Sequence, residues 1–414
     1  MFFATINQIL LYIALFMGLY FAIFVFTTFF EHKDKIYYQA KKKFLPKISL
    51  IVPCYNEEKN LSRTIESLLK VDYPQSHLEI IIVDDGSTDH TLQEALFYSQ
   101  QYPHIKVFHK KNGGKYTALN LGIKKASHPY IATVDADSYV HAQSLKKIMA
   151  YFENKRVMAV IATVRIAQPK SILEAVQYVE YLVSAVYRKA FGFLNSISVV
   201  PGPLSVFNKK VFHKIGFYKK AHQTEDLEFA LRMQKANLLI AYAVDAIVYT
   251  QGCRTFKELL RQRLRWNRGF LLNMRDYTEL LNIKKHGNLS FLLLNSLTGS
   301  VLVICLFFFS FYRFLHFLYQ KINQLVLVKT DFFHFSWQWS DWIRWEITPL
   351  FFLGIIAMLI FFAYLFLSKK ITRDPGPKKI NVLFYLMIYP LINPLFWLVT
   401  FWTVFTKKKE VLWN

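Results

Sequence analysis

The sequence has few cysteines and few acidic residues for a chain of 414 residues. Its three cysteines, Cys54, Cys253 and Cys305, are odd in number and far apart, which excludes a small scaffold held by disulfides. The 12 histidines are scattered, and no group of cysteines and histidines has the spacing of a zinc site. A Walker A motif is also missing, because Gly113-Gly114-Lys115 lacks both the earlier glycine and the following Ser or Thr.

Acidic residues number 28 against 51 Lys and Arg, so the formal net charge is +23. That excess alone fits a nucleic acid, an anionic membrane surface or a phosphorylated substrate. Hydrophobic residues make up 53% of the chain, which excludes a disordered tail. Because the apolar residues are clustered and no nucleic-acid-binding module is recognised, we predict a membrane protein with a water-soluble part and no nucleic-acid partner.

The first apolar run covers about residues 9–30 and is long enough to span a bilayer. No basic segment precedes it and no small-residue cleavage site follows it, which argues against a cleaved signal peptide. The lysines that follow it are Lys33, Lys35, Lys41, Lys42 and Lys43. By the positive-inside rule, the next segment is expected in the cytosol.

Three further apolar segments come later, at about residues 290–319, 347–368 and 382–406. The basic connection 369–379 is predicted to be a cytosolic loop, and the tryptophan-rich stretch 332–345 an interfacial belt on the outer face.

The last apolar segment presents a conflict. Four simple crossings would place Lys407, Lys408 and Lys409 outside, against the positive-inside rule. Alternatively, Pro390 and Pro394 break this segment into a re-entrant pair, which leaves the tail inside. The sequence leaves both topologies open.

Between the membrane segments, short apolar runs alternate with helical patterns. The runs at 48–53, 79–83, 106–108 and 130–134 are typical of buried strands, and the patterns at 60–70, 91–98, 115–125 and 143–152 are typical of helices. This alternation predicts an α/β fold with a parallel sheet covered on both faces. We expect an N-terminal transmembrane helix in residues 1–30, a cytosolic domain with interfacial helices in 31–285, and a membrane domain of about three segments in 286–414.

Three of the predicted strands end in polar clusters, and ligands of open α/β sheets bind beyond such ends. These clusters are Pro53-Cys54-Tyr55-Asn56-Glu57, Asp84-Asp85-Gly86-Ser87-Thr88-Asp89 and Asp135-Ala136-Asp137. Any one of them could simply form a turn, because Asp and Asn commonly begin turns. Together, they would place mutually repelling carboxylates on one rim, which then needs a cation or a cationic ligand.

Asp135 and Asp137 are the best candidates for a metal site. Two carboxylates one residue apart suit a hard divalent cation such as Mg²⁺ or Mn²⁺, which often shares its oxygen ligands with substrate phosphates. Lys115 fits either a phosphate contact or a surface position at the start of a helix.

Two later motifs add further candidates. A predicted helix begins with Gln223-Thr224-Glu225-Asp226. Asp226 could be a general base, or Glu225 and Asp226 could be an acidic pair that the helix dipole favours at this end. Gln262, Arg265 and Trp266 share one face of another predicted helix, and this face suits a diphosphate and a sugar ring. The alternative is a basic amphipathic helix on the membrane surface, which fits the neighbouring Arg261, Arg263 and Arg268.

In this order, the motifs Asp-Asp-Gly-Ser, Asp-x-Asp, Thr-Glu-Asp and Gln-x-x-Arg-Trp resemble those of the processive membrane glycosyltransferases of family 2. This family makes cellulose, chitin, hyaluronan and poly-N-acetylglucosamine, and the layout of one apolar segment before and three after the soluble part is closest to the last group. The resemblance covers about residues 47–275 and implies a GT-A-type nucleotide-sugar-binding domain inserted between transmembrane helices. It also makes 171–191 either an interfacial helix or a core helix.

The resemblance implies a role for each candidate residue. Tyr55, Glu57 and one of Asp84 and Asp85 would hold the nucleoside, Asp135 and Asp137 the metal and diphosphate, and Lys115 the phosphates. Asp226 would be the catalytic base, with Glu225 and Asp137 also at the reacting centre. Gln262, Arg265 and Trp266 would meet the acceptor and the diphosphate, and the loop 200–205 would lie near the acceptor.

The implied function is inverting, metal-dependent transfer from a UDP-sugar, with UDP-GlcNAc as the best candidate, to a growing β-linked polysaccharide at the inner membrane, coupled to export. Because four apolar segments are few for a polymer channel, we expect a homo-oligomer or a small membrane subunit. Two alternatives stay open: a non-processive transferase acting on a ceramide- or polyprenyl-phosphate-type lipid, and a catalytically inactive scaffold. The sugar, the linkage and the chain length are not specified by the sequence.

Overall fold

The computed structural model describes residues 2–40, 44–328 and 349–406. It divides into two compact units. The first, which we call the helical unit, comprises Met1–Phe24 and Asn295–Tyr364. The second, which we call the sheet unit, comprises Val25–Leu294 and Leu365–Asn414.

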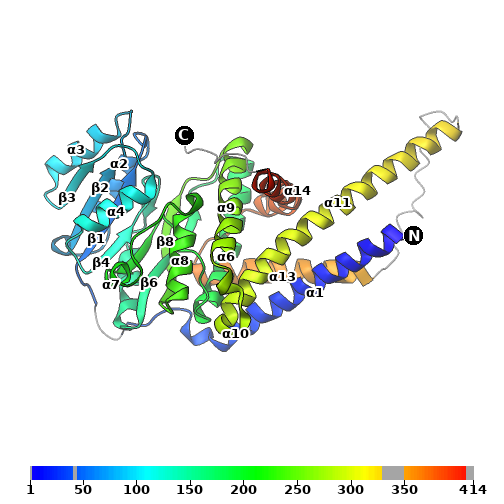
Figure 1. The fold of residues 1–414 in the computed structure, drawn as a ribbon, viewed down its shortest axis with the longest axis horizontal. Helices are drawn as coiled ribbons and strands as arrows, with labels where there is room; N and C mark the ends of the chain where they lie inside the picture. Colours follow the sequence, from blue (N-terminus) through cyan, green and yellow to red (C-terminus); the bar gives the residue numbers. More distant parts are fainter. Residues whose placement is uncertain (1, 41–43, 329–348, 407–414) are drawn as a thin grey trace. The chain divides into compact units, whose positions relative to one another are not determined.

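The sheet unit is built on eight strands in the order β3-β2-β1-β4-β7-β6-β8-β5 (Figure 1). Their bounds are β1 Ile48–Cys54, β2 Leu78–Asp84, β3 Ile105–His109, β4 Tyr130–Thr133, β5 Tyr139–Val140, β6 Val157–Ile166, β7 Ser205–Asn208 and β8 Leu239–Thr250. Strands β3, β2, β1 and β4 run parallel, which confirms the parallel arrangement predicted for them. Every residue of β1 and β2 is buried, as expected for strands covered on both faces.

The connecting helices follow the predicted pattern. They are α2 Leu61–Leu69, α3 Thr91–Gln101, α4 Lys115–Lys125 and α5 Ser144–Ala150. In α2 the buried side chains Leu61, Thr64, Ile65 and Leu68 recur at helical spacing, which fixes the face that packs on the sheet.

The sheet as a whole is mixed rather than purely parallel. Strand β7 runs antiparallel to both β4 and β6, and β5 runs antiparallel to β8. The reason lies in the chain path, because Ser205 at the start of β7 pairs with Thr133 at the end of β4. The chain therefore enters β7 from the rim at which β4 leaves the sheet.

Three long helices of the sheet unit lie beside this second half of the sheet, and the last of them packs against the other two (Figure 1). They are α6 Ile172–Phe193, α9 Phe256–Asp276 and α14 Lys379–Phe405. Ser171 with Glu174 and Thr255 with Glu258 form capping boxes that begin α6 and α9. Helix α14 continues through Pro390 and Pro394, so these prolines do not divide it.

The remaining elements of the sheet unit are short. They are α7 Lys210–Ile215, α8 Glu225–Lys235, α10 Ile283–His286, and the 3₁₀ turns η1 Lys33–Lys35, η2 Gln75–His77, η3 Tyr151–Glu153, η4 Ala221–Gln223 and η5 Thr278–Leu281.

Four helices in the described part of the chain are long and apolar enough to cross a membrane. They are α1 Phe2–Glu31, α11 Asn288–Val328, α13 Pro349–Thr372 and α14. Their positions agree with the four apolar segments read from the sequence. The tryptophan-rich stretch 332–345 and Lys407–Lys409 lie outside the described residues.

Candidate active site

The polar clusters that end β1, β2 and β4 lie on one rim, because these strands are parallel neighbours. Cys54 is in register with Asp84, and the backbone N–H of Asp85 donates to the carbonyl of Cys54 over 2.9 Å. The sheet therefore brings the predicted clusters together.

Asp84 and Asp85 are both buried and both have partners within the protein. Asp85 accepts from Lys110 Nζ at 2.5 Å and from the backbone N–H of Gly114 at 2.8 Å, which holds the loop that begins α4. Asp84 accepts from His109 Nδ1 at 2.6 Å. Between them and that loop, a Cβ on Gly86 would meet the backbone nitrogen of Asn112 at 2.7 Å, so only glycine fits this approach.

Glu57 lies in the loop after β1, next to the partly buried Tyr55. Its carboxylate accepts from Asn60 Nδ2 at 2.8 Å. Burial raises the pKa of Glu57 to about 7 against the lowering by the hydrogen bond from Asn60, and the charges of Asp137 and Asp135 add to the rise. Glu57 therefore shares an electrostatic environment with the Asp-x-Asp motif.

Lys115 lies at the centre of the acidic group. Its ammonium is 2.5 Å from Asp135 Oδ1 and 3.9 Å from Glu225 Oε1. Burial alone would lower the pKa of Lys115, but these two carboxylates raise it above its usual value, so the side chain remains charged. Of the two readings of Lys115, the structure favours an internal position in the site over an exposed surface lysine.

Asp135 and Asp137 can supply two carboxylates to a divalent cation. Burial and the charge of Asp135 raise the pKa of Asp137. Such a rise is expected where two carboxylates repel each other, and a bound cation would reduce this repulsion. Among the described residues, no group of three or more His, Cys, Asp or Glu side chains is arranged to hold a metal ion. The remaining ligands would therefore have to come from water or from the phosphates of a substrate.

The loop 200–205 lies across this group. A Cβ on Gly202 would meet both carboxylate oxygens of Asp135 at 2.6 Å and Lys115 Nζ at 2.8 Å. The backbone N–H of Val200 donates to the carbonyl of Asp226 over 3.3 Å. The loop thus joins the Asp-x-Asp motif to the start of α8, and Gly202 is the residue that allows this close approach.

Asp226 lies in the first turn of α8 and accepts from the backbone N–H of Leu227 at 2.9 Å. Burial and the neighbouring Glu225 raise the pKa of Asp226 to about 6, against the lowering effect of Lys115 and Arg265. A carboxylate with this pKa suits a proton acceptor near neutral pH.

The predicted residues of α9 occupy three different settings. Arg265 lines a small cavity together with His222, Gln223 and Thr403. The side-chain oxygen of Gln262 is buried and has no hydrogen-bond partner within the described part of the chain. Trp266 has the guanidinium of Arg263 4.5 Å from its ring centre.

Arg263 is one of the three arginines that fit the alternative of a basic helix on the membrane surface, and the structure does not place it on an exposed face. Arg263 is buried, and its Nη2 lies 2.6 Å from Glu180 Oε2 in α6. Tyr389 of α14 donates to the other oxygen of Glu180 over 3.2 Å. The signal that was missed is Glu180 itself, a lone carboxylate within an otherwise apolar helix stripe.

Sequence reasoning also missed the residues of α9 that hold the Thr-Glu-Asp motif. Asn273 Nδ2 donates to Thr224 Oγ1 over 3.0 Å, and a Cβ on Gly269 would meet the Thr224 side chain at 2.3 Å. Ala221, His222 and Gln223, which precede Thr224, all have positive φ angles, of 44°, 54° and 65°. A strained turn therefore leads into Asp226, and α9 clamps its end.

Three comparisons bear on this arrangement. Residues 49–216 match the family described as glycosyl transferase family 2. The chain is 27% identical over 414 residues to a poly-β-1,6-N-acetyl-D-glucosamine synthase of Staphylococcus epidermidis, covering 98% of this chain and 96% of the relative. The synthase of the same name from Staphylococcus aureus strain COL is 28% identical over 286 residues, which are 67% of this chain and 68% of the relative.

A mannosyltransferase from Pyrobaculum calidifontis, solved with GDP-mannose and Mn²⁺, has a similar fold, with a TM-score of 0.59 at 16% identity over 95% of this chain and 99% of that one. This likeness bears on the fold, which is a GT-A-like mixed α/β sheet accompanied by apolar helices that are able to span a membrane. The predicted fold class is confirmed.

Proposed function

We propose that this chain transfers sugar from a UDP-sugar, with UDP-GlcNAc as the donor, to a growing β-linked polysaccharide, which the match of residues 49–216 to glycosyl transferase family 2 supports. The observation that carries the proposal is the group of Lys115, Asp135, Glu225 and Asp226 beneath the loop 200–205. The match to poly-β-1,6-N-acetyl-D-glucosamine synthases over nearly the whole chain supports a polymer product.

The proposed reaction is a single displacement. Asp226 accepts the proton of the acceptor hydroxyl while that oxygen attacks the anomeric carbon of the donor. One displacement inverts the configuration, so an α-linked donor gives a β-linkage. The pKa of about 6 keeps Asp226 mostly ionised at neutral pH, ready to take this proton.

The cationic residues face the other half of the donor. Lys115 and Arg265 stand close enough to Asp226 to lower its pKa, and from there they can stabilise the negative charge on the departing UDP. Asp135 and Asp137 would hold Mg²⁺ or Mn²⁺, which neutralises diphosphate charge when bound. Tyr55, Glu57 and one of Asp84 and Asp85 are assigned to the nucleoside, and Gln262 and Trp266 to the acceptor.

The base assignment is tested with Asp226→Asn. We expect sugar transfer to fall by on the order of 10²–10⁴-fold, with UDP binding nearly unchanged, because only the proton acceptor is lost. Asp72→Asn serves as a matched control, since Asp72 is a partly exposed carboxylate paired with Lys146 on the surface. Transfer at a normal rate by Asp226→Asn would refute the assignment.

Donor and product are tested together in membranes. Release of UDP is measured with a panel of UDP-sugars and either Mg²⁺ or Mn²⁺, and the product is then digested with linkage-specific hydrolases. We expect UDP-GlcNAc to be preferred and the product to be a polymer. A single sugar attached to a lipid would instead establish the lipid-acceptor alternative.

The proposed location is the cell membrane, with the catalytic domain of residues 31–285 in the cytosol and apolar helices of residues 1–30 and 286–414 in the bilayer. The lysines that follow the first span support this orientation. Export of the polymer is proposed to need a second copy of the chain or a small membrane subunit. A lone purified chain that secretes polymer from proteoliposomes would contradict this requirement.

A further inference from the structure

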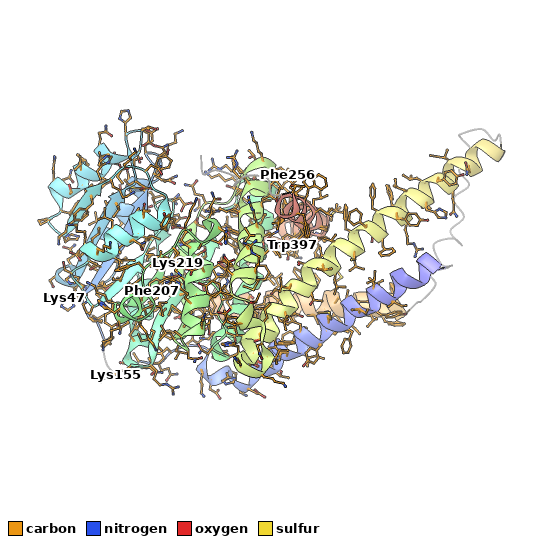
Figure 2. The ribbon with its side chains drawn as sticks, in the orientation of Figure 1. Lys47, Lys155, Phe207, Lys219, Phe256 and Trp397 are labelled. Carbon is orange, nitrogen blue, oxygen red and sulfur yellow. The ribbon has the colours of Figure 1, made fainter. Side chains whose placement is uncertain are left out.

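Helix α14 packs against α6 and α9 of the sheet unit, and the labelled Phe256 and Trp397 in Figure 2 mark the place at which α9 and α14 meet. Tyr389 donates to Glu180 of α6, and the ring of Phe396 lies 6.0 Å from that of Phe256 at the start of α9. Thr403, near the end of α14, lines the same small cavity as Arg265 of the candidate active site. The C-terminal end of α14 is therefore at the level of the active site.

The start of α14 is also held by the sheet unit. In the loop just before it, Asp374 is buried and lies 3.1 Å from Arg165 Nε of β6, and Tyr178 of α6 donates to its other oxygen. The last turn of α13 is fixed in the same way, because Tyr37 donates to the carbonyl of Ile371 over 3.0 Å. Both ends of α14 thus lie against one water-soluble domain.

This arrangement conflicts with a membrane crossing. At ~1.5 Å per residue, the 27 residues of α14 extend about 40 Å, which exceeds the ~30 Å hydrocarbon core. A crossing helix of this length would carry its C-terminal end to the far side of the bilayer. Thr403 instead shares a cavity with His222, Gln223 and Arg265, which are polar side chains of the catalytic domain.

The outward face of α14 indicates what covers it. The exposed residues of this face are Leu383, Met387, Leu391, Leu395, Trp402 and Phe405. They form an apolar stripe at helical spacing, with Phe396 and Thr400 buried on the other side. Exposed Lys378 and Lys379 precede the stripe, and further lysines follow it in the sequence. An apolar stripe between lysines fits an anionic lipid leaflet, into which such helices insert sideways.

We propose that α14 does not cross the membrane but lies in the leaflet on the catalytic side, with its inner face on α6 and α9 and its outer face in lipid. Both of its ends are then on the same side as the catalytic domain. This resolves the charge conflict of the last apolar segment without breaking the helix at Pro390 and Pro394. It leaves two crossing candidates, α11 and α13, after the catalytic domain.

The two ends of α14 provide the test. Lys379→Cys and Thr406→Cys are introduced singly into the full chain, with Gln100→Cys on the exposed side of α3 as a control for the catalytic side. Cells, intact or opened, are treated with a membrane-impermeant polyethylene-glycol maleimide, and each added cysteine is counted by its gel shift over the native chain. We expect all three added shifts only in opened cells. Labelling of Thr406→Cys from the side opposite to Lys379→Cys would overturn the proposal.

A depth profile decides the matter if lipid shields Thr406. Spin labels at Leu383, Met387, Leu391 and Trp402 report their depth in the full chain reconstituted in vesicles, through collisions with oxygen and with a water-soluble relaxant. We expect a uniform shallow depth of about 5–10 Å. Labels at the exposed Phe352, Leu359 and Phe366 of α13 give the matched profile of a crossing candidate. A maximum depth near Leu391 that falls toward both ends of α14 would refute the proposal. Neither measurement depends on sugar transfer, so its failure is separate from failure of the proposed function.

Discussion

The Asp226 carboxyl group is subject to opposing electrostatic effects. Burial and Glu225 raise its pKa, whereas Lys115 and Arg265 lower it, and the balance is a pKa of about 6. The same cations are assigned to the diphosphate of the donor. One group of charges therefore sets the proton affinity of the base and offers a binding site to the leaving group.

A pH profile tests this balance. Below its pKa the Asp226 carboxyl is protonated and cannot accept a proton, so we expect the initial rate of UDP release to rise through a midpoint near pH 6. Glu225→Gln removes the largest neighbouring charge that raises the pKa, so its midpoint should lie below that of the native chain. A midpoint that stays in place or moves upward would show that Glu225 does not act on Asp226 in this way.

The candidate residues were predictable because each lies in a short local motif at a strand or helix end. The contacts that organise them were not. Asn273 is 49 positions from Thr224, and Arg263 is 83 positions from Glu180, so no local pattern connects these pairs. Arg263 in particular looks like its basic neighbours on α9, and only the packing of α6 shows that it points inward.

At the level of secondary-structure elements, prediction worked best where a single periodicity dominates. The runs of β1 and β2 are largely apolar and are flanked by turn signals, so their strands and connecting helices were predictable. The antiparallel β7 was not, because its four residues follow a long helix and a loop. The sequence could not decide whether α6 is an interfacial helix or a core helix. One face of α6 packs on the sheet and another on α14, so both faces are apolar.

The contact between α9 and the turn before α8 carries the next prediction. Gly269→Ala would place a Cβ 2.3 Å from the Thr224 side chain, so the turn must shift and carry Asp226 with it. We expect kcat to fall by roughly 10-fold to 100-fold with little change in the donor KM, since a misplaced base slows chemistry more than donor binding.

Two controls make the Gly269 result specific. Thr224→Ala removes the two closest atoms and should restore part of the activity of Gly269→Ala. Gly192→Ala is a matched helical substitution in α6, where the new Cβ meets Ile197 at 3.5 Å, an ordinary contact, and should leave kcat unchanged. Equal loss from both glycine substitutions would point to general damage to helix packing.

On the larger scale of the sheet unit, polar contacts as well as apolar packing join the end of α13 and helix α14 to the sheet and to α6. Arg165 of β6 pairs with Asp374, Ser368 donates to the carbonyl of Val183, and Tyr389 donates to Glu180. These bonds hold the end of α13, the loop before α14 and the middle of α14 against the rest of the sheet unit. The Lys and Arg residues behind the net charge of +23 therefore fall into two groups. A few lie in the candidate active site, and many of the others follow apolar segments in the sequence.

Among these contacts, the buried Arg165–Asp374 pair is the one whose loss by a single substitution should destabilise the structure most. Asp374→Ala leaves Arg165 buried without this carboxylate, and breaking such a pair costs about 3–5 kcal/mol. We expect the 373–378 loop to detach, so that trypsin cleaves after Arg373 and Lys378 several-fold faster in detergent-solubilised chain. Asp72→Ala, which breaks a partly exposed pair with Lys146, should leave the cleavage rate unchanged. An unchanged rate for Asp374→Ala would mean that the ends of α13 and α14 are held to the catalytic domain by their apolar contacts instead.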